Sequence, residues 1–230
     1  MMRNVASEVV YSNKHWERLD EQRDRAISML RPFHDSHITC IVYGSIARGD
    51  TSEGSDIDVF IPTPPSPTMI EAVLESSGIR YGGRQIIQAT PSYAAKGYII
   101  IDDKHGYSFP LVDMRSNEAE FTRFAGQVGL ADLENNVRVP GVNKELHLIE
   151  PTNTGHTETT VQGVEGLVAR KLGVDIRIVN ERVRALKRRE KVGRTGVFIK
   201  RDLGPDESFS SVFQELIRSK PALRRRLRNS

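Results

Sequence analysis

The feature that most constrains the fold is a Gly-Ser pair that ends one apolar run and precedes an Asp-x-Asp pair opening another. Residues 38–43 form a short β-rich run that stops at Gly44, and Ser45 follows directly. Ten residues separate Ser45 from Asp56, and Asp58 then stands between apolar side chains. Because side chains alternate along a strand, Asp56 and Asp58 should share one face while their apolar neighbours point into the core. Both runs are therefore predicted to be buried strands.

The Gly-Ser pair has the properties of a phosphate-binding turn. Glycine lets a ligand approach the backbone closely, and the free N–H groups at the start of a helical turn favour a phosphate. The Ser45 hydroxyl can add a hydrogen bond to a phosphate oxygen. Arg48 lies one turn later and can supply a fixed positive charge. These residues are candidates for binding the phosphates of a nucleotide.

The paired carboxylates predict a divalent metal ion. Asp56 and Asp58 would repel each other unless a cation sits between them. Oxygen ligands select Mg²⁺ or Mn²⁺, whose coordination is typically completed by substrate phosphates. A third carboxylate is expected as base or metal ligand, and Asp113 is the best candidate because it is an isolated charge in an apolar run. Asp102 and Asp103 compete for this role, but they fall at a predicted turn, where Asp is common for local reasons.

These residues resemble a known signature. Gly44-Ser45 followed by Asp56-x-Asp58 is similar to the motif of the DNA polymerase β-like nucleotidyltransferase superfamily. The fuller string, Gly-Ser-x-Ala-Arg-Gly with Ser-Asp-x-Asp, resembles its minimal nucleotidyltransferase branch, which also contains kanamycin nucleotidyltransferase-like enzymes. The resemblance covers about residues 36–116.

The resemblance implies a role for each matching residue. It implies that the Gly-Ser turn binds the nucleotide phosphates, that the paired carboxylates bind two metal ions, and that a third carboxylate on a later strand activates the attacking hydroxyl. The candidate catalytic and metal-binding residues are Asp56, Asp58 and Asp113, and the candidate nucleotide-binding residues are Gly44, Ser45, Arg48 and Ser55.

The whole chain is predicted to be an α/β (α+β) protein, with a mixed-sheet nucleotidyltransferase fold followed by a small winged helix-turn-helix domain. The expected domains are residues 1–135, a β-rich connector at 136–162 with one strand at 146–149, and a basic domain at 163–230. The first domain should contain helices at 13–31, 68–77 and 117–133. Its further strands should lie at 85–89 and in a hairpin at 98–101 and 107–114.

The C-terminal portion carries the positive charge of the chain. Residues 163–230 have a net charge of +10 and the preceding residues −7, an asymmetry that suggests a polyanionic partner for one part only. Two helices, at 163–172 and 175–191, are followed by a Gly-punctuated strand or hairpin at 192–201, a pattern similar to a winged helix-turn-helix domain. The second helix would be the recognition helix. The alternative interpretation is that its basic surface serves protein contact or solubility. Its candidate nucleic-acid contacts, with one from the wing, are Arg177, Asn180, Arg184, Lys187, Arg188 and Arg194.

The sequence therefore predicts a nucleotidyltransferase that uses Mg²⁺ or Mn²⁺ and moves an NMP from an NTP, expected to be ATP, to a hydroxyl acceptor. Nucleic acid is the expected partner, and a protein acceptor is possible. The alternative is a nucleic-acid-binding regulator whose nucleotidyltransferase domain senses nucleotide without catalysis. His147 and His156 lie near Glu150 and Glu158 but match no zinc spacing. The single cysteine, Cys40, and the lack of a long apolar stretch favour a cytoplasmic protein without membrane contact.

Overall fold

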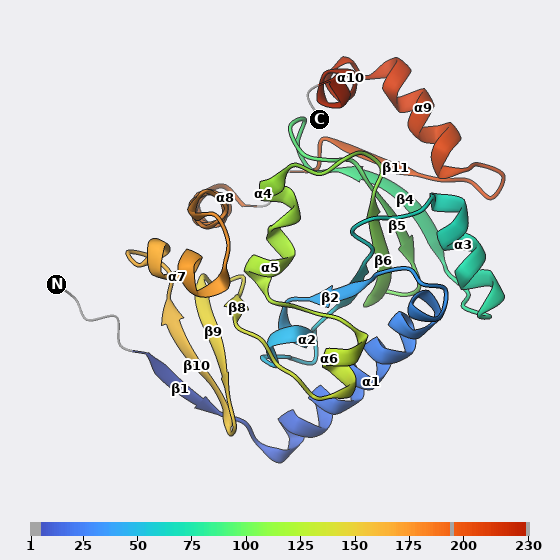
Figure 1. Ribbon diagram of the computed structural model, residues 1–230. Coiled ribbons are helices and arrows are strands. Elements are labelled where there is room, and N and C mark those ends of the chain that lie inside the picture. Colours follow the sequence, from blue (N-terminus) through green and yellow to red (C-terminus); the bar gives the residue numbers. More distant parts are fainter. Residues whose placement is uncertain (1–5, 194–195, 229–230) are drawn as a thin grey trace.

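The computed structural model describes residues 6–193 and 196–228, and it contains two β-sheets with helices packed around them (Figure 1). The larger sheet has the strand order β11-β4-β5-β6-β3-β2-β7, and the smaller one β1-β10-β9-β8. Within these residues no helix is long and apolar enough to cross a membrane. The strands of the larger sheet are β2 (Ile41–Tyr43), β3 (Ile57–Phe60), β4 (Gly83–Gln88), β5 (Lys96–Ile100), β6 (His105–Pro110), β7 (Gln127–Val128) and β11 (Ile199–Asp202).

The smaller sheet consists of β1 (Ser7–Val10), β8 (Gly141–Val142), β9 (His147–Thr152) and β10 (Gly155–Thr160). The helices are α1 (Asn13–Asp35), α2 (Ser45–Arg48), α3 (Pro67–Ser76), α4 (Ser116–Ala119), α5 (Phe121–Ala125), α6 (Leu130–Glu134), α7 (Glu165–Leu172), α8 (Ile176–Val192), α9 (Phe209–Ser219) and α10 (Pro221–Arg228). Mixed sheets surrounded by helices fit the α+β nucleotidyltransferase fold that the sequence predicts.

One face of the larger sheet carries the main hydrophobic core. Ile57 and Val59 on β3 are buried in it, with Phe33 of α1 and Leu74 of α3. β3 lies between β2, to which it is antiparallel, and β6, to which it is parallel. Because successive side chains of a strand point to opposite faces, Asp58 points away from Ile57 and Val59. It therefore lies on the sheet face opposite α1 and α3. The predicted alternation of β3 is thus confirmed.

The first helix and the 96–114 hairpin follow the prediction, except at their ends. Ser12, rather than Asn13, caps α1, because its Oγ accepts a hydrogen bond from the N–H of His15 at 3.3 Å. The helix continues through Pro32 to Asp35 instead of ending before the proline. In the hairpin, β6 ends at Pro110, four residues earlier than the expected limit at Met114. This shorter strand leaves Asp113 outside the sheet.

The single helix expected at residues 117–133 is wrong. That segment instead contains α4, α5, the short strand β7 and α6. Gly126 explains the break: it has a φ of 82°, and a Cβ there would lie 2.9 Å from Cγ of Arg48 and 3.1 Å from the Pro140 carbonyl oxygen. The chain therefore turns out of α5 at Gly126, and Val128 pairs with Val42 at the edge of the larger sheet.

The connector predicted as irregular β structure is the centre of the second sheet. β9 and β10 form an antiparallel hairpin, which β1 and β8 extend on its two sides. This sheet packs under α7 and α8 in a second core that includes Leu148, Val168 and Val179. Phe124 of α5 belongs to the same core, so α5 stands between the two sheets (Figure 1).

The predicted helix pair near residues 163–191 is present as α7 and α8, with Asp175 as the N-cap of α8. The expected wing is different. Residues 199–202 form β11, which pairs antiparallel with β4 at the edge of the larger sheet, with Ile199 opposite Gln88. The described part of 163–230 is therefore divided between both cores, and no wing beside α8 is formed from β11.

The last two helices anchor the C-terminal segment to the larger sheet. Phe209 of α9 packs edge-on against Phe109 of β6, with 5.1 Å between ring centroids. In α10, Arg226 is 2% exposed and pairs at 2.9 Å with Glu118 of α4, which is 6% exposed. Arg226 also donates to the Asp113 carbonyl oxygen at 2.8 Å. This buried ion pair ties α10 to the segment that follows β6.

Removing the arginine of this pair should destabilise the protein strongly. Arg226→Ala leaves the Glu118 carboxylate buried without its cation, which costs about 3–5 kcal/mol in free energy of unfolding. Arg225→Ala, on the exposed side of the same helix, should change it by less than about 0.5 kcal/mol. Urea denaturation of the two variants measures the difference, and equal losses would contradict the anchoring role.

Candidate active site

The Gly-Ser turn joins β2 to the short helix α2 at one edge of the open sheet face. Gly44 has a φ of 86°, a left-handed conformation that favours glycine, and its N–H donates to the Gly126 carbonyl oxygen at 2.9 Å. Ser45 Oγ donates to Ser55 Oγ at 3.2 Å, and Ser55 Oγ accepts from the N–H of Ser52 at 2.9 Å. The loop between the two motifs therefore folds back, and it brings the predicted Ser45 and Ser55 together.

Asp56 and Asp58 lie beside this turn on the open face. Burial raises the pKa of Asp58 above its ordinary value, and the Asp56 carboxylate raises it further. Lys144 and Lys96 act in the opposite direction. Of these two cations, Lys96 is at the start of β5 and Lys144 is on the turn between β8 and β9.

Two phenols share the face with Asp58. Tyr43 on β2 and Tyr98 on β5 both have pKa values raised mainly by burial and then by the Asp58 carboxylate, that of Tyr98 to about 12. Both side chains are therefore neutral at physiological pH. The Tyr43 ring contacts Phe121 of α5 edge-on, at 6.0 Å between centroids. Aromatic rings therefore lie on the same sheet face as the carboxylate pair.

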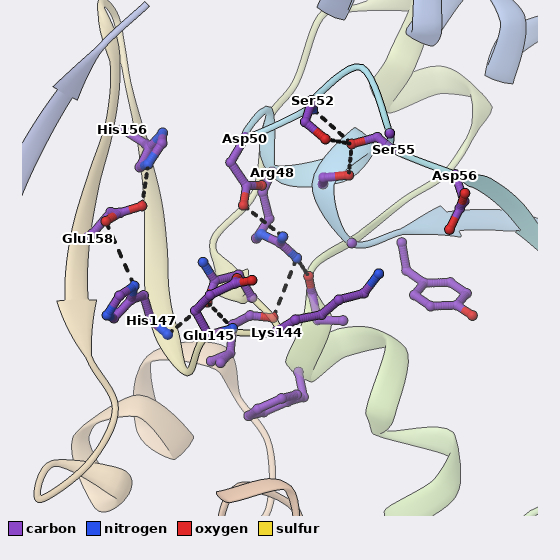
Figure 2. A pocket seen from close by; sticks show the side chains of 18 of the residues that line it. Arg48, Asp50, Ser52, Ser55, Asp56, Lys144, Glu145, His147, His156 and Glu158 are labelled. Atoms are coloured by element: carbon purple, nitrogen blue, oxygen red, sulfur yellow. Dashed lines mark hydrogen bonds and ion pairs between the residues drawn. The ribbon is translucent and has the colours of Figure 1, made fainter. Parts of the chain in front are cut away.

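A cleft of about 750 Å³ lies in front of the turn and the carboxylates. Gly44, Ser45, Ser55, Asp56 and Asp58 all line it. The opposite wall comes from the smaller sheet, the turn between β8 and β9, and α8. Figure 2 shows the two walls facing each other, with the Arg48–Asp50 pair between them. The structure brings these predicted residues together on the first wall, and the sequence analysis assigned no function to the residues of the second.

The wall on the smaller sheet carries a chain of hydrogen-bonding side chains. Tyr11 Oη and His156 Nδ1 are 2.7 Å apart, and His156 Nε2 is 3.1 Å from Glu158 Oε1. The other Glu158 oxygen lies 3.8 Å from Nδ1 of His147 (Figure 2). His156 is thus a buried, partnered histidine, and within the described residues no three His, Cys, Asp or Glu side chains form a metal site.

Arg48 has contacts different from those expected of a phosphate ligand. Its side chain is 5% exposed, and Nη1 donates to the Ala125 carbonyl oxygen at 2.6 Å. Nη2 forms an ion pair with Asp50 at 2.9 Å. Both terminal nitrogens of Arg48 therefore already have acceptors within the protein. The side chain connects α2 to α5 at the bottom of the cleft.

Asp113 is not brought to the site. It is exposed, lies beyond the end of β6, and is not among the residues that line the cleft. On β6 the residues that share the face of Asp58 are Gly106 and Ser108, which pair with Asp58 and Phe60. Neither of these β6 residues is an acid, so β6 places no carboxylate beside Asp58. The structure does not support the assignment of Asp113 as the third carboxylate.

The recognition helix predicted at the C-terminal side is only partly a free surface. Arg182 of α8 lines the cleft, with its guanidinium carbon 4.8 Å from the centroid of the Phe121 ring. Arg177 pairs with Asp175 at 2.6 Å. Of the predicted nucleic-acid contacts, Arg177, Arg184 and Arg188 are exposed, Asn180 and Lys187 are half-buried, and Arg194 lies outside the described residues.

The carboxylate pair fits one divalent ion. Mg²⁺ is commonly held by one or two carboxylates together with waters and substrate phosphates. Asp56 and Asp58 would supply the protein ligands, and the adjacent Gly44 and Ser45 could take the phosphates. A second ion would need a further carboxylate on this face, which β6 does not provide.

Comparison with known proteins supports this interpretation. Residues 19–105 match the family model described as nucleotidyltransferase domain, a range that includes both motifs. The match supports the nucleotidyltransferase superfamily. It also supports a transferase role for the chain. No curated protein and no solved structure matches the chain.

The residues of the second wall, which sequence reasoning missed, lie outside the matched range. One weak signal was available: His156 and Glu158 alternate with threonines along β10, as Asp56 and Asp58 alternate with apolar residues on β3. Nothing in the sequence indicated that β10 faces the Gly-Ser turn. The missed residues on the second wall are Tyr11, Asn143, Lys144, Glu145, His147, His156, Glu158, Arg182 and Leu186.

The raised pKa of Asp58 predicts that this residue lowers stability. A carboxyl whose folded-state pKa is raised reduces the free energy of unfolding above that pKa, and the penalty disappears as pH falls below the unfolded value. Asp58→Asn should therefore stabilise the protein at pH 7, with a gain that shrinks toward pH 3 to about zero. Urea denaturation across this range measures it, with the exposed Asp103→Asn as control. A loss of stability in Asp58→Asn at pH 7 would contradict the electrostatic description.

Proposed function

We propose that the protein is a nucleotidyltransferase that moves an NMP from an NTP, expected to be ATP, to a hydroxyl acceptor. The observation that carries this proposal is that Ser45, Asp56 and Asp58 line one cleft beside the left-handed turn at Gly44. A phosphate-binding turn beside paired carboxylates is the equipment of phosphoryl and nucleotidyl transfer.

The reaction can be followed through the residues of the cleft. Gly44 and Ser45 would bind the β- and γ-phosphates and orient the α-phosphorus toward the open side. Asp56 and Asp58 would hold Mg²⁺ or Mn²⁺, which when bound neutralises charge on the phosphoryl oxygens. The acceptor oxygen forms a bond to the α-phosphorus, the bond to the bridging oxygen breaks, and pyrophosphate leaves. The hydroxyl proton passes to water in the open cleft.

Substitution of either carboxylate should abolish transfer. Asp56→Asn and Asp58→Asn keep the size of the side chain but remove the charge that binds the ion, so a loss of at least about 100-fold is expected. The assay incubates the protein with each α-labelled NTP, Mg²⁺ or Mn²⁺, and RNA, DNA or lysate protein. Asp206→Asn, at an exposed position between β11 and α9 and outside the cleft, should retain the wild-type rate.

The same assay identifies the acceptor class from the labelled macromolecule. Full activity in either cleft variant would overturn the assignment. Calorimetric binding of an Mg²⁺–NTP complex with no labelled product on any acceptor would instead favour the regulator that senses nucleotide without catalysis.

We further propose that the exposed face of α8 binds nucleic acid. Arg184 and Arg188 are four residues apart and exposed, so they present two cations on one solvent-facing side of α8. Contacts to phosphates release counterions and make affinity depend steeply on salt.

Neutralising two of these arginines should reduce that salt dependence. For Arg184→Gln/Arg188→Gln, the slope of log affinity against log salt should fall by about two, because two phosphate contacts are lost. Fluorescence anisotropy with a labelled duplex measures the slope. Lys14→Gln/Arg25→Gln on α1 removes the same charge elsewhere and should leave it unchanged. An equal decrease in both double variants would contradict a site on α8.

A further inference from the structure

Three lysine or arginine side chains line the cleft in the described part of the chain, and they are Arg48, Lys144 and Arg182. Arg48 is engaged on both terminal nitrogens, by the Ala125 carbonyl oxygen and by Asp50. The other two belong to the second wall, since Lys144 lies on the β8–β9 turn and Arg182 on α8. Neither has a hydrogen-bond or ion-pair partner among the described residues. The cleft therefore contains two cations that no protein group contacts as a partner.

Arg182 is held by an aromatic ring rather than by an acid. Its guanidinium carbon lies over the Phe121 ring, 4.8 Å from the centroid. Its Nε is buried without a hydrogen-bond partner, and the adjacent Glu181 already accepts from the Asn117 amide at 3.1 Å. Burial lowers the pKa of Arg182, but an arginine stays protonated at neutral pH. Because a buried donor without an acceptor is costly, this guanidinium favours an anionic ligand.

The Phe121 ring connects Arg182 to the Gly-Ser turn. The same ring contacts Tyr43 edge-on, at 6.0 Å between centroids, and Tyr43 directly precedes Gly44 in the chain. Leu186, one turn after Arg182 on α8, also lines the cleft, so this side of the helix faces the cleft. Arg182 and the Gly-Ser turn therefore belong to opposite walls that are joined through two aromatic rings.

A short turn presents Lys144 to the cleft. The Asn143 side-chain oxygen accepts from the N–H of Glu145 at 3.1 Å and from the N–H of His147 at 2.9 Å. The Asn143 N–H in turn donates to the His147 carbonyl oxygen at 3.0 Å. These hydrogen bonds fix the backbone on both sides of Lys144. Figure 2 shows its side chain extending from this turn into the cleft, on the side of Asp56.

We propose that Arg182 and Lys144 form a phosphate subsite on the second wall, which binds the triphosphate of the NTP across the cleft from the Gly-Ser turn. The inference rests on the proposed function and names the cations that Arg48 does not supply. A guanidinium fork and an ammonium both form charge-assisted hydrogen bonds to phosphate oxygens. When the bond between the α-phosphorus and the bridging oxygen breaks, its electron pair stays on the pyrophosphate. The two cations stabilise this charge.

Calorimetric binding of α,β-methylene-ATP, pyrophosphate and AMP, each with Mg²⁺, tests the subsite without any acceptor. Arg182→Gln and Lys144→Gln should each weaken binding of α,β-methylene-ATP and of pyrophosphate about tenfold, because a charge-assisted hydrogen bond is lost. Affinity for AMP, which lacks the β- and γ-phosphates, should not change. Wild-type affinity for α,β-methylene-ATP in either folded variant would overturn the inference, and so would an equal loss for AMP.

Matched variants control for the change in net charge. Arg170→Gln on α7 and Lys191→Gln on α8 make the same substitutions at exposed positions outside the cleft, and they should bind all three compounds normally. Arg182→Lys keeps a cation at the position and should lose less affinity than Arg182→Gln.

The phosphates of a nucleic acid have the same chemistry as those of the triphosphate, so a second binding assay separates the two. In fluorescence anisotropy with the labelled duplex, Arg182→Gln and Lys144→Gln should keep the wild-type affinity. A loss of duplex binding with unchanged binding of α,β-methylene-ATP would assign the two cations to a nucleic acid and overturn the inference.

Failure of the inference and failure of the proposed function give different results. A wild-type protein that does not bind α,β-methylene-ATP with Mg²⁺ would contradict the proposed function, and the inference with it. Binding that Asp56→Asn abolishes but the two cation variants leave intact would overturn the inference alone. Both cation variants are expected to fold, because neither side chain has a hydrogen-bond or ion-pair partner among the described residues. If Arg182→Gln does not fold, wild-type affinity in Lys144→Gln, on an exposed turn, would still overturn the inference.

Discussion

The two-residue alternation of β3 is the constraint on which the site depends. Ile57 and Val59 are buried to within 1% exposure in the main core, so the strand cannot rotate or slip by one residue without exposing them. The same alternation holds Asp58 on the open face. Hydrophobic burial thus fixes a carboxylate in a position where charge repulsion and desolvation both disfavour it, and the raised pKa of Asp58 records that cost.

The second wall of the cleft depends on a smaller set of contacts. Arg48 and α5 connect the two sheets, because Arg48 binds the Ala125 carbonyl oxygen and Phe124 packs into the core under α7 and α8. Gly126 permits the close approach that this connection requires. The matched family range supplies Gly44, Ser45, Asp56 and Asp58, and the chain outside that range supplies the second wall of the cleft.

The sequence predicted the parts that depend on local pattern. The alternation around Asp58, the Gly-Ser turn, and the helices that became α1, α7 and α8 follow from periodicity and capping, which neighbouring residues decide. The errors concern long-range pairing: β11 was expected as a wing beside α8 and instead extends the larger sheet at β4. Asp113 was chosen because the strand was expected to run to Met114, but β6 ends at Pro110 and Asp113 is exposed beyond it.

A crystal structure of the protein with Mn²⁺ and α,β-methylene-ATP tests the central claim most directly. We expect one anomalous manganese peak between Asp56 and Asp58, with the triphosphate against Gly44 and Ser45. Nucleotide bound outside this cleft, or manganese held by other residues, would contradict the account.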